Sequence, residues 1–327
     1  MVDMNTTTNG TAPWNGSWNC SSLNSAAVKT GKTIALSLIF VVSLVGNSLV
    51  GIIVYRTPNL RKPINFLIAN MALSDLLFPT FLLPKRLLDL HVDSWLISGV
   101  LGQILCKLHA FLVEASSLVS VQSLVLISVD RFGAVVVPLR SPLISRKLCP
   151  FFILATWIVA IAVASPNLFS YKLVENPGEM KCQNQWAKTF GEISFVTYLL
   201  AGVSVFFYIP MILLVAVYSI ILIKLKKHVH PGEQSANAEE QRTKSNRNVL
   251  KMAIAIVLAF FLCWLPAYTI VLIIQFLEPT SSIRSSCSFQ AFSIFTYFLA
   301  FANCAINPTI LFISSSNYRK GLKRLVN

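Results

Sequence analysis

Seven apolar stretches separated by polar segments occupy most of the chain. They cover Thr33–Tyr55, Ile64–Leu88, Ile104–Val129, Leu148–Tyr171, Ile193–Leu225, Val249–Leu277 and Phe289–Ile313. Crossing a hydrocarbon core about 30 Å thick takes about 20 helical residues, and each stretch supplies them. The pattern predicts an all-α membrane protein built as a bundle of seven transmembrane helices. Because seven is odd, we expect the chain ends on opposite sides of the membrane, and the paired repeats of many transporters are disfavoured.

Composition supports this class. Hydrophobic residues make up 55% of the 327 residues and charged residues 12%, whereas soluble domains average about 25% charged residues. A large soluble helical protein is the alternative, but its helices would carry a polar face that these stretches mostly lack. Seven spans leave no room for a second globular domain.

The net charge of +14 is distributed asymmetrically along the chain. Basic residues gather after the first, third, fifth and seventh stretches, most densely in Lys224–Lys251. The positive-inside rule therefore places these segments in the cytoplasm and the N-terminus outside. This distribution argues against nucleic acid as a partner. The basic loop Lys224–Lys251 is expected either to contact anionic membrane lipids or only to fix the topology.

The polar N-terminal segment supports the same orientation. Four residues in it begin an Asn-x-Ser/Thr sequon and are candidate glycosylation sites: Asn5, Asn9, Asn15 and Asn19. Chance occurrence in an Asn/Thr-rich tail is the alternative. Because residues 1–25 lack an apolar core typical of a signal peptide, we expect the first span to act as an uncleaved signal.

Four cysteines are expected outside the membrane, and four cysteines allow three pairings. Cys106 begins the third helix, and Cys182 lies between the fourth and fifth. A bridge between them would hold that loop over the bundle, and we predict it. Cys20 and Cys287 could form a second bridge from the N-terminal segment to the seventh helix; a free thiol is the alternative.

Asp75 is a charged residue inside a predicted span, about 16 Å along its helix. A charge at such a depth costs at least about 2.5–3.5 kcal/mol and requires a reason. Its candidate partners carry short oxygen-bearing side chains: Ser116, Ser120, Asn303, Asn307 and Asn47. A carboxylate among such oxygens suits a hard cation such as sodium. A purely structural polar network is an equal alternative from spacing alone.

Two further features concern helix geometry and the cytoplasmic end. Pro266 and Pro308 lie inside predicted spans, where proline loosens the helix, and Trp264 precedes Pro266 by two residues. Trp264 could therefore swing beside a loosened turn, although proline is common in membrane helices. Asp130 and Arg131 follow Cys106 by a full crossing of about 37 Å. They form either a functional pair or a simple interfacial anchor.

These motifs together resemble those of rhodopsin-like (class A) G-protein-coupled receptors, and the chain is closest in character to neuropeptide receptors. The matching motifs follow in order along the chain: Gly46-Asn47, Leu73-Ser74-Asp75-Leu76, Cys106, Asp130-Arg131-Phe132 with Pro138-Leu139, Trp157, Pro210 with Tyr218, Phe260 to Pro266, Asn303, and Asn307-Pro308. Each motif alone is weak, but their ordered combination from about Thr33 to Leu325 is specific.

The resemblance implies roles for the membrane-embedded residues. Four of them match the family's allosteric sodium pocket: Asp75, Ser120, Asn303 and Asn307. This match favours the ion over a purely structural network, and no other metal or cofactor is expected. Trp264 matches the toggle beneath the ligand. The family's connector triad corresponds to Pro210, Val121 and Phe260.

At the cytoplasmic end, Arg131 matches the residue that meets the G protein once the sixth helix moves outward. Tyr218 would support Arg131 in that state. The chain departs from the family's pattern at three positions: Phe132 and Leu311, where tyrosine is usual, and Asn246, where many relatives carry an acid. Leu311 is expected to make the active state less stable.

The resemblance also implies the domain organisation. We expect an extracellular, glycosylated and disordered segment over residues 1–30 and a seven-helix receptor domain over 31–313. Residues 314–327 are expected to form a cytoplasmic amphipathic eighth helix with a short tail, and Tyr318 is its expected aromatic residue.

The ligand class is narrowed mainly by exclusion. Phe301 stands where a retinal-binding lysine would be, and Val113 stands where amine receptors carry aspartate. Glu114 could replace that aspartate as the anion for a basic ligand. It could instead pair with Lys85 or Arg86, or be satisfied within the bundle.

The long segment between the fourth and fifth spans resembles the strand hairpin of neuropeptide receptors. Residues that could line an amphipathic ligand cavity are Lys85, Arg86, Val113, Glu114, Trp186, Glu192, Tyr268, Gln275, Gln290 and Tyr297. The sequence therefore favours a plasma-membrane receptor that binds an extracellular peptide and activates a heterotrimeric G protein, with arrestin and membrane lipids as further partners.

Several alternatives remain. One is a class A receptor for a lipid or another small non-amine ligand, and a second is an atypical receptor with weak or constitutive coupling. A transporter or channel would need a polar pathway and matched broken helices, which are not visible. An enzyme is disfavoured because no nucleophile–base pair or metal-ligand cluster is evident.

Overall fold

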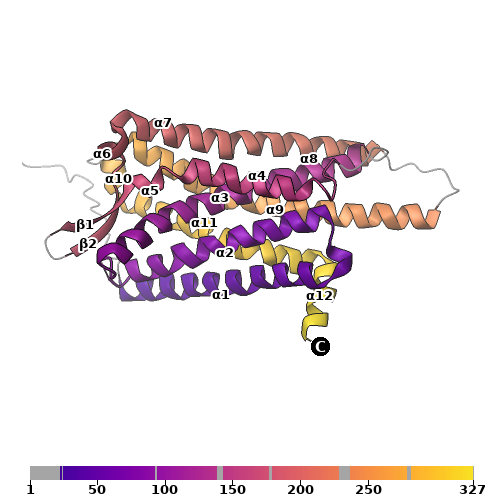
Figure 1. Cartoon of the computed structure of the whole chain (residues 1–327), viewed down its shortest axis with the longest axis horizontal. Helices are drawn as coiled ribbons and strands as arrows, with labels where there is room; N and C mark the ends of the chain where they lie inside the picture. The colour runs from indigo at the N-terminus through magenta and orange to yellow at the C-terminus, as the bar shows by residue number, and fades with distance from the viewer. Residues whose placement is uncertain are drawn as a thin grey trace, which may run out of the picture.

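The computed structural model describes residues 23, 25–92, 94–137, 143–176, 179–227, 236–277 and 281–326. Seven helical segments within them are long and apolar enough to cross a membrane, which confirms the predicted bundle. The chain is therefore a multi-pass membrane protein. Figure 1 shows the long helices running side by side along the longest axis of the molecule.

The first three spans are single helices, and the fourth and fifth are composite. The spans consist of α1 (Ala26–Arg56), α2 (Pro63–Asp89), α3 (Gly99–Val136), α4 with α5 (Cys149–Ala164, Asn167–Ser170), α7 with η3 and α8 (Glu192–Val203, Ser204–Tyr208, Ile209–Lys227), α9 (Ala236–Phe276) and α11 (Cys287–Ser314). The π-helical turn η3 ends two residues before Pro210, whose missing N–H and bulky ring disturb the regular hydrogen-bond ladder.

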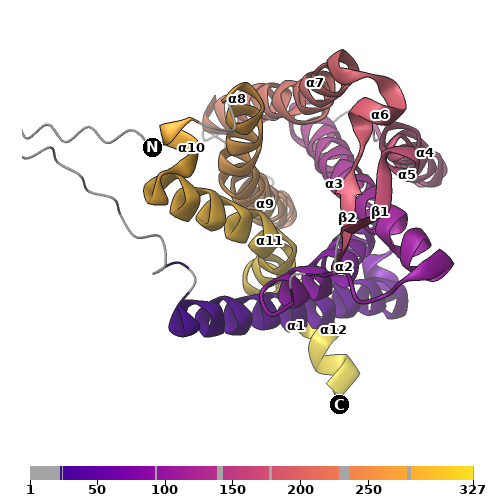
Figure 2. The ribbon, with the colours of Figure 1, turned by 90° about the vertical axis from the view of Figure 1, so that its left-hand side faces the viewer.

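Shorter elements cover the two ends of the bundle. They are η2 (Pro58–Leu60), β1 (Tyr171–Asn176), β2 (Glu179–Asn184), α6 (Trp186–Phe190), α10 (Ser282–Ser285) and α12 (Ser316–Val326). Strands β1 and β2 form an antiparallel hairpin in which Leu173 is opposite Cys182. The hairpin lies across one end of the ring of helices (Figure 2), which we call the hairpin end. Helix α12 lies at the opposite end (Figure 1).

Helix boundaries depart from the apolar stretches where polar residues continue a helix. Helix α9 begins at Ala236, so the second half of Lys224–Lys251, predicted to be a loop, is helical. Its residues 236–248 are rich in Ala, Glu, Gln, Arg and Lys, which favour helix without being apolar. Helix α1 begins at Ala26 because the Ser25 hydroxyl accepts a hydrogen bond from Val28 N at 3.4 Å. Residues 26–30, which were predicted to belong to a disordered segment, are therefore helical.

The bundle has the inside-out polarity of a membrane protein. Large apolar side chains such as Leu38, Ile212 and Leu262 are more than 60% exposed, whereas Asn47, Asp75 and other polar side chains are buried. Such a surface would be a liability in water, but it suits lipid, in which only structures with internally paired backbones are stable. The seven helices therefore enclose polar side chains and face outward with apolar ones.

The spans also approach each other closely. A Cβ atom added to Gly46 on α1 would lie 2.8 Å from the Pro308 ring on α11, so glycine is required for this contact.

Helix α12 is anchored by Tyr318, which is 1% exposed and donates a hydrogen bond to Asn65 Oδ1 on α2 at 3.2 Å. Its basic residues are exposed, which confirms the predicted amphipathic eighth helix.

Candidate functional site

A cavity of about 390 Å³ lies between the helices toward the hairpin end. Helices α2, α3, α7, α9 and α11 and both hairpin strands contribute to its lining. Its polar lining residues are Arg86, His109, Glu114, Ser117, Asn167, Tyr171, Asn184, Tyr198, Tyr268 and Tyr297. A cavity of this size, with a few polar groups on largely apolar walls, is typical of a ligand site.

The hairpin beside this cavity is fixed to the bundle at several points. Cys182 on β2 forms a disulfide with Cys106 on α3, which confirms the predicted bridge. Trp95 N donates to Met180 O at 2.6 Å, and Leu173 N donates to the side chain of Gln103 on α3 at 3.0 Å. The hairpin is therefore held over α3. The predicted second bridge involves Cys20, which lies outside the described residues.

Glu114 carries a partly buried carboxylate in the wall of the cavity. Tyr198 on α7 donates its hydroxyl to Glu114 Oε1 at 2.6 Å, and the Asn167 amide donates to Oε2. The Tyr198 ring stacks on Trp186, with ring centroids 4.5 Å apart. Three elements that are far apart in the sequence thus meet at this one side chain.

The two basic residues that the sequence offered as partners of Glu114 pair with a different acid. Lys85 and Arg86 pair instead with Asp89, at 2.6 Å and 3.8 Å, one turn further along α2. Lys85 also lies 5.8 Å from the centre of the Trp95 ring. Of the pairings considered from the sequence, the one between Glu114 and Lys85 or Arg86 is not found among the described residues.

Of the ten predicted ligand residues, five line the cavity and four do not. Those that line it are Arg86, Val113, Glu114, Tyr268 and Tyr297. Lys85, Trp186, Gln275 and Gln290 are not part of the lining, and Trp186 packs behind Tyr198. The side chain of Glu192 lies outside the described residues.

Sequence reasoning missed His109, Asn167 and Tyr198 in the cavity wall. Helical spacing could have found His109, because it precedes Val113 by four residues and so shares a face of α3. Nothing local distinguishes Asn167 or Tyr198, whose position depends on how α5 and α7 pack against α3.

A column of aromatic rings on α9 forms the floor of the cavity. Tyr268, Trp264 and Phe260 follow at intervals of four residues and therefore share one helix face. The ring centroid of Trp264 lies 5.3 Å from that of Tyr268 and 6.0 Å from that of Phe260. Phe78 on α2 contacts Trp264 edge-on at 5.7 Å. A ligand that displaces Trp264 would therefore disturb the packing between α9 and α2.

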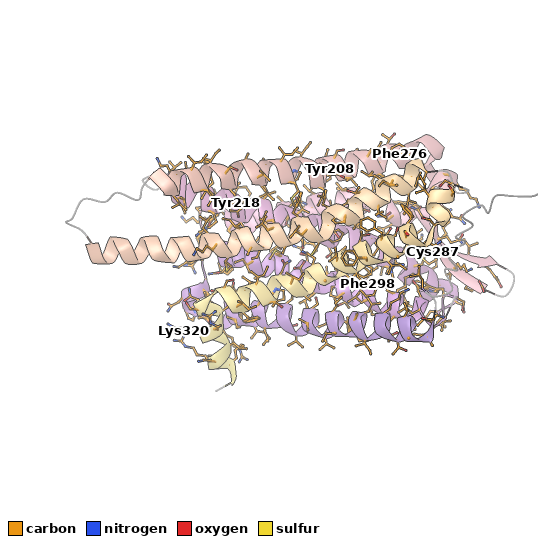
Figure 3. The ribbon with its side chains drawn as sticks, turned by 180° about the vertical axis from the view of Figure 1, so that it is seen from behind. Tyr208, Tyr218, Phe276, Cys287, Phe298 and Lys320 are labelled. Carbon is orange, nitrogen blue, oxygen red and sulfur yellow. A yellow bond between two sulfur atoms is a disulfide. The ribbon has the colours of Figure 1, made fainter. Side chains whose placement is uncertain are left out.

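Of the residues of the predicted connector triad, Val121 lines the cavity, whereas Phe260 and Pro210 do not. Phe260 and Val121 are 1% and 3% exposed and belong to one apolar cluster. Pro210 is half-buried on α8, just after the π-helical turn, and Phe207 from that turn packs at 6.3 Å from Phe260. Figure 3 shows Tyr208 and Tyr218 on the same span as this turn. The aromatic column thus connects the cavity with the packing of α3 and α8.

A buried polar network surrounds Asp75. Its Oδ1 accepts from the Ser120 hydroxyl at 2.7 Å, and its Oδ2 accepts from the Asn307 amide at 2.8 Å. The Ser116 hydroxyl donates to Ser74 O at 2.6 Å. Asn47 donates to Cys304 O at 2.8 Å and so links α1 to α11. The structure therefore brings Ser120 and Asn307 into direct contact with Asp75, while Ser116 and Asn47 bind nearby backbone.

A small cavity of about 10 Å³ lies between this network and Trp264. Asp75, Ser116, Ser120 and Asn303 line it. Two buried polar atoms, Asn303 Nδ2 and Asn307 Oδ1, have no hydrogen-bond partner among the described residues. Unpartnered buried polar atoms beside a space of about one water indicate that a small polar species completes the network.

The end of α3 opposite the hairpin carries an ion pair. Arg131 donates to Asp130 Oδ2 from Nη2 at 2.5 Å and from Nε at 3.2 Å, and the arginine side chain is 13% exposed. The Ser128 hydroxyl donates to Tyr218 OH on α8 at 2.9 Å. Leu311 is 1% exposed within the apolar core. Ser128 is thus a hydrogen-bond partner of Tyr218 that sequence reasoning missed.

Pro138 and Leu139 lie outside the described residues, and so does the side chain of Asn246. The sequons Asn5, Asn9, Asn15 and Asn19 also lie outside them.

A ligand-sized cavity toward one end of a seven-helix bundle, connected by packed side chains to an ion pair at the other, defines a membrane receptor. The family model described as 7 transmembrane receptor (rhodopsin family) matches residues 46–311. The chain belongs to this family.

Curated relatives are named as peptide receptors. The RYamide receptor of Drosophila melanogaster is 29% identical over 88% of this chain, and the match spans 61% of the relative. The QRFP-like peptide receptor of Branchiostoma floridae is 27% identical over 92% of this chain and 79% of the relative. Neuropeptide FF receptor 2 of Mus musculus is 29% identical over 88% of this chain and 70% of the relative.

Proposed function

We propose that this protein is a plasma-membrane receptor that binds an extracellular peptide and activates a heterotrimeric G protein. The hairpin end then faces outside, and Arg131 faces the cytoplasm. The observation that carries the proposal is the 390 Å³ cavity with charged and aromatic lining beneath a disulfide-anchored hairpin. The names of its relatives, which are receptors for RYamide, QRFP-like peptide and neuropeptide FF, agree with a peptide ligand.

The packing suggests how the cavity and the cytoplasmic end are coupled. A peptide in the cavity contacts Tyr268 and Trp264, and the Trp264 ring packs on Phe260, which lies against the helices α3 and α8. Pro266 loosens α9 next to Trp264, so the cytoplasmic part of this helix can move outward. The movement frees Arg131 to bind the G protein. A peptide shifts this equilibrium only by its different affinity for the two states.

The residues around the small cavity fit the sodium ion expected from the sequence. Asp75, Ser116, Ser120 and Asn307 offer the carboxylate, hydroxyl and amide oxygens that a hard cation prefers. These residues would hold the ion, which would supply a positive charge against the buried Asp75 carboxylate. We propose sodium as an allosteric ligand of the inactive receptor.

Replacing Asp75 by asparagine is expected to abolish the effect of sodium on peptide affinity. The change keeps the shape but removes the charge that attracts the ion. When two sites are coupled in this way, the ligand at one site typically changes the affinity for the ligand at the other by roughly 5- to 150-fold. The measurement is agonist affinity on membranes in sodium chloride and in N-methylglucamine chloride.

Ser117→Ala is the matched control for this measurement. Ser117 borders the same small cavity but donates its hydroxyl to Val113 O of its own helix. This variant should retain the sodium effect. A sodium effect that survives in Asp75→Asn would contradict the proposed ion site.

The proposed function is tested by a peptide screen on cells that express the whole chain with a G protein accepting signals from many receptors. A response to peptides, absent from cells without the receptor, supports the proposal. A response only to lipids or other small molecules would show that the ligand belongs to the alternative class and is not a peptide. Strong signalling without any ligand would indicate a constitutive receptor.

The proposal includes two further cytoplasmic partners. Exposed basic residues at this end, such as Lys251 and Lys320, are suited to anionic lipid headgroups. Arrestin would bind to the same opening as the G protein.

A further inference from the structure

Glu114 is the one acidic residue among those that line the large cavity. It belongs to the third span, and its carboxylate lies partly buried between α3, α5 and α7. The donors that it has are neutral, namely the Tyr198 hydroxyl and the Asn167 amide. No ion pair joins it to a Lys, Arg or His among the described residues.

The basic residues of the cavity have other partners. Arg86 lies within ion-pair distance of Asp89, and His109 Nδ1 is 2.9 Å from Phe81 O. A buried carboxylate is costly unless a positive charge or several hydrogen bonds compensate for it. Because a carboxylate can accept about four hydrogen bonds, Glu114 has acceptor positions beyond the two in use. The cavity wall therefore presents an anion whose countercharge the bundle does not supply.

The surroundings of Glu114 are suited to a flat or compact cation. Aromatic rings of Phe195, Tyr198 and Phe206 also line the cavity, and aromatic faces attract cations. Tyr198 is held by stacking on Trp186, and its hydroxyl fixes the orientation of the carboxylate. The carboxylate thus has a defined position before any ligand arrives.

We propose that Glu114 binds a cationic group of the ligand, the guanidinium of an arginine or the ammonium of a lysine. This inference rests on the proposed function as a peptide receptor and specifies which peptides the cavity accepts. Tyr198 and Asn167 act as positioning residues for the carboxylate. The peptide ligand accordingly carries a basic side chain that reaches α3, and Glu114 determines this preference.

The test uses the full-length receptor in cells and pools of short amidated peptides. The pools differ at one fixed position, which holds arginine, lysine, citrulline or norleucine. Citrulline has nearly the shape of arginine but no charge. Because a hydrogen bond to a charged group contributes about 1.5–3 kcal/mol, we expect the wild type to favour the arginine or lysine pool over citrulline by about 10- to 100-fold in potency.

The variant Glu114→Gln should reduce this ratio to about one, through a loss of potency on the basic pool. Glu175→Gln is the matched control, because Glu175 is an exposed carboxylate on the hairpin and does not line the cavity. It should keep the wild-type ratio. Surface staining of an N-terminal tag shows whether each variant is present in equal amount. Tyr198→Phe, which keeps the charge, should weaken the response to the basic pool without removing the preference.

The inference and the function on which it rests fail in different ways. If no pool activates the wild type, the peptide-receptor function is wrong and the inference falls with it. If the wild type responds equally to arginine, lysine and citrulline, the inference is overturned while the function stands. A ratio that persists in Glu114→Gln also overturns it, because the cation then binds elsewhere. If Glu114→Gln does not reach the cell surface, the inference is still tested by the potency ratio of the wild type and by the response of Tyr198→Phe.

Discussion

Arg131→Ala is expected to abolish G-protein activation while peptide binding persists. Arg131 is the basic member of the ion pair at the end of α3 that lies opposite the hairpin, at the other end of the bundle from the ligand cavity. The guanidinium offers five donors in a fixed fork, which alanine cannot replace. Because each hydrogen bond to a charged group contributes about 1.5–3 kcal/mol, losing these contacts should lower activation at least tenfold. The measurement is agonist-stimulated nucleotide exchange, together with radioligand binding on the same membranes.

Asp130→Asn is the matched control and should act in the opposite direction. It keeps the shape of the side chain but weakens its hold on Arg131, now bound at 2.5 Å and 3.2 Å. Signalling without ligand should therefore rise. Normal signalling by Arg131→Ala at normal surface amount would reject the proposed role of this residue.

The sequence predicted those parts of the molecule that local patterns determine. Membrane spans follow from runs of apolar residues, because lipid tolerates few exceptions. Asp75 stood out because a charge in a span is costly, and its contacts with Ser120 and Asn307 agree with the expectation. Cys106 and Cys182 could be paired because both were expected at the same membrane face.

Other features depend on packing that no local pattern reveals. The extension of α9 to Ala236 was missed because helix-forming polar residues resemble a loop in a hydropathy profile. The contacts of Glu114 with Asn167 and Tyr198 join three segments across the bundle. Gln275 and Gln290 were expected in the cavity from their position along the helices, but helix rotation leaves them exposed.

Leu311, which stands where the family usually has tyrosine, lies in the apolar core of the bundle. Its side chain is buried in the apolar core, so it adds packing where a tyrosine would bring a hydroxyl. Tyr218 is only 6% exposed and accepts a hydrogen bond from Ser128. In this chain, a hydrogen bond between α3 and α8 therefore holds the Tyr218 hydroxyl. The expectation of a less stable active state stays a prediction.

Of the variants proposed for this protein, Cys182→Ser, which removes the disulfide, should lower the free energy of unfolding the most. The bridge to Cys106 closes a segment with a sequence separation of 76 residues. By the chain-entropy estimate, removing a loop closure of this length costs about 4.5 kcal/mol. The hairpin carries Tyr171 and Asn184 into the cavity lining, so peptide binding should fall as well. Thermal melting of the solubilised receptor and peptide affinity on membranes measure the two effects.

Cys149→Ala provides the comparison for Cys182→Ser, because Cys149 is a buried free cysteine at the start of α4, away from the cavity. It should cost only the packing of one sulfur atom and leave peptide affinity unchanged. Backbone bonds from Trp95 to Met180 and from Gln185 to Ser170 still restrain the hairpin without the bridge. If those bonds alone were sufficient, Cys182→Ser would match the wild type in both measurements, and the disulfide would not be needed to position the hairpin. We expect instead that affinity falls more than the loss of folded receptor explains, because the hairpin moves away from α3 before the bundle unfolds.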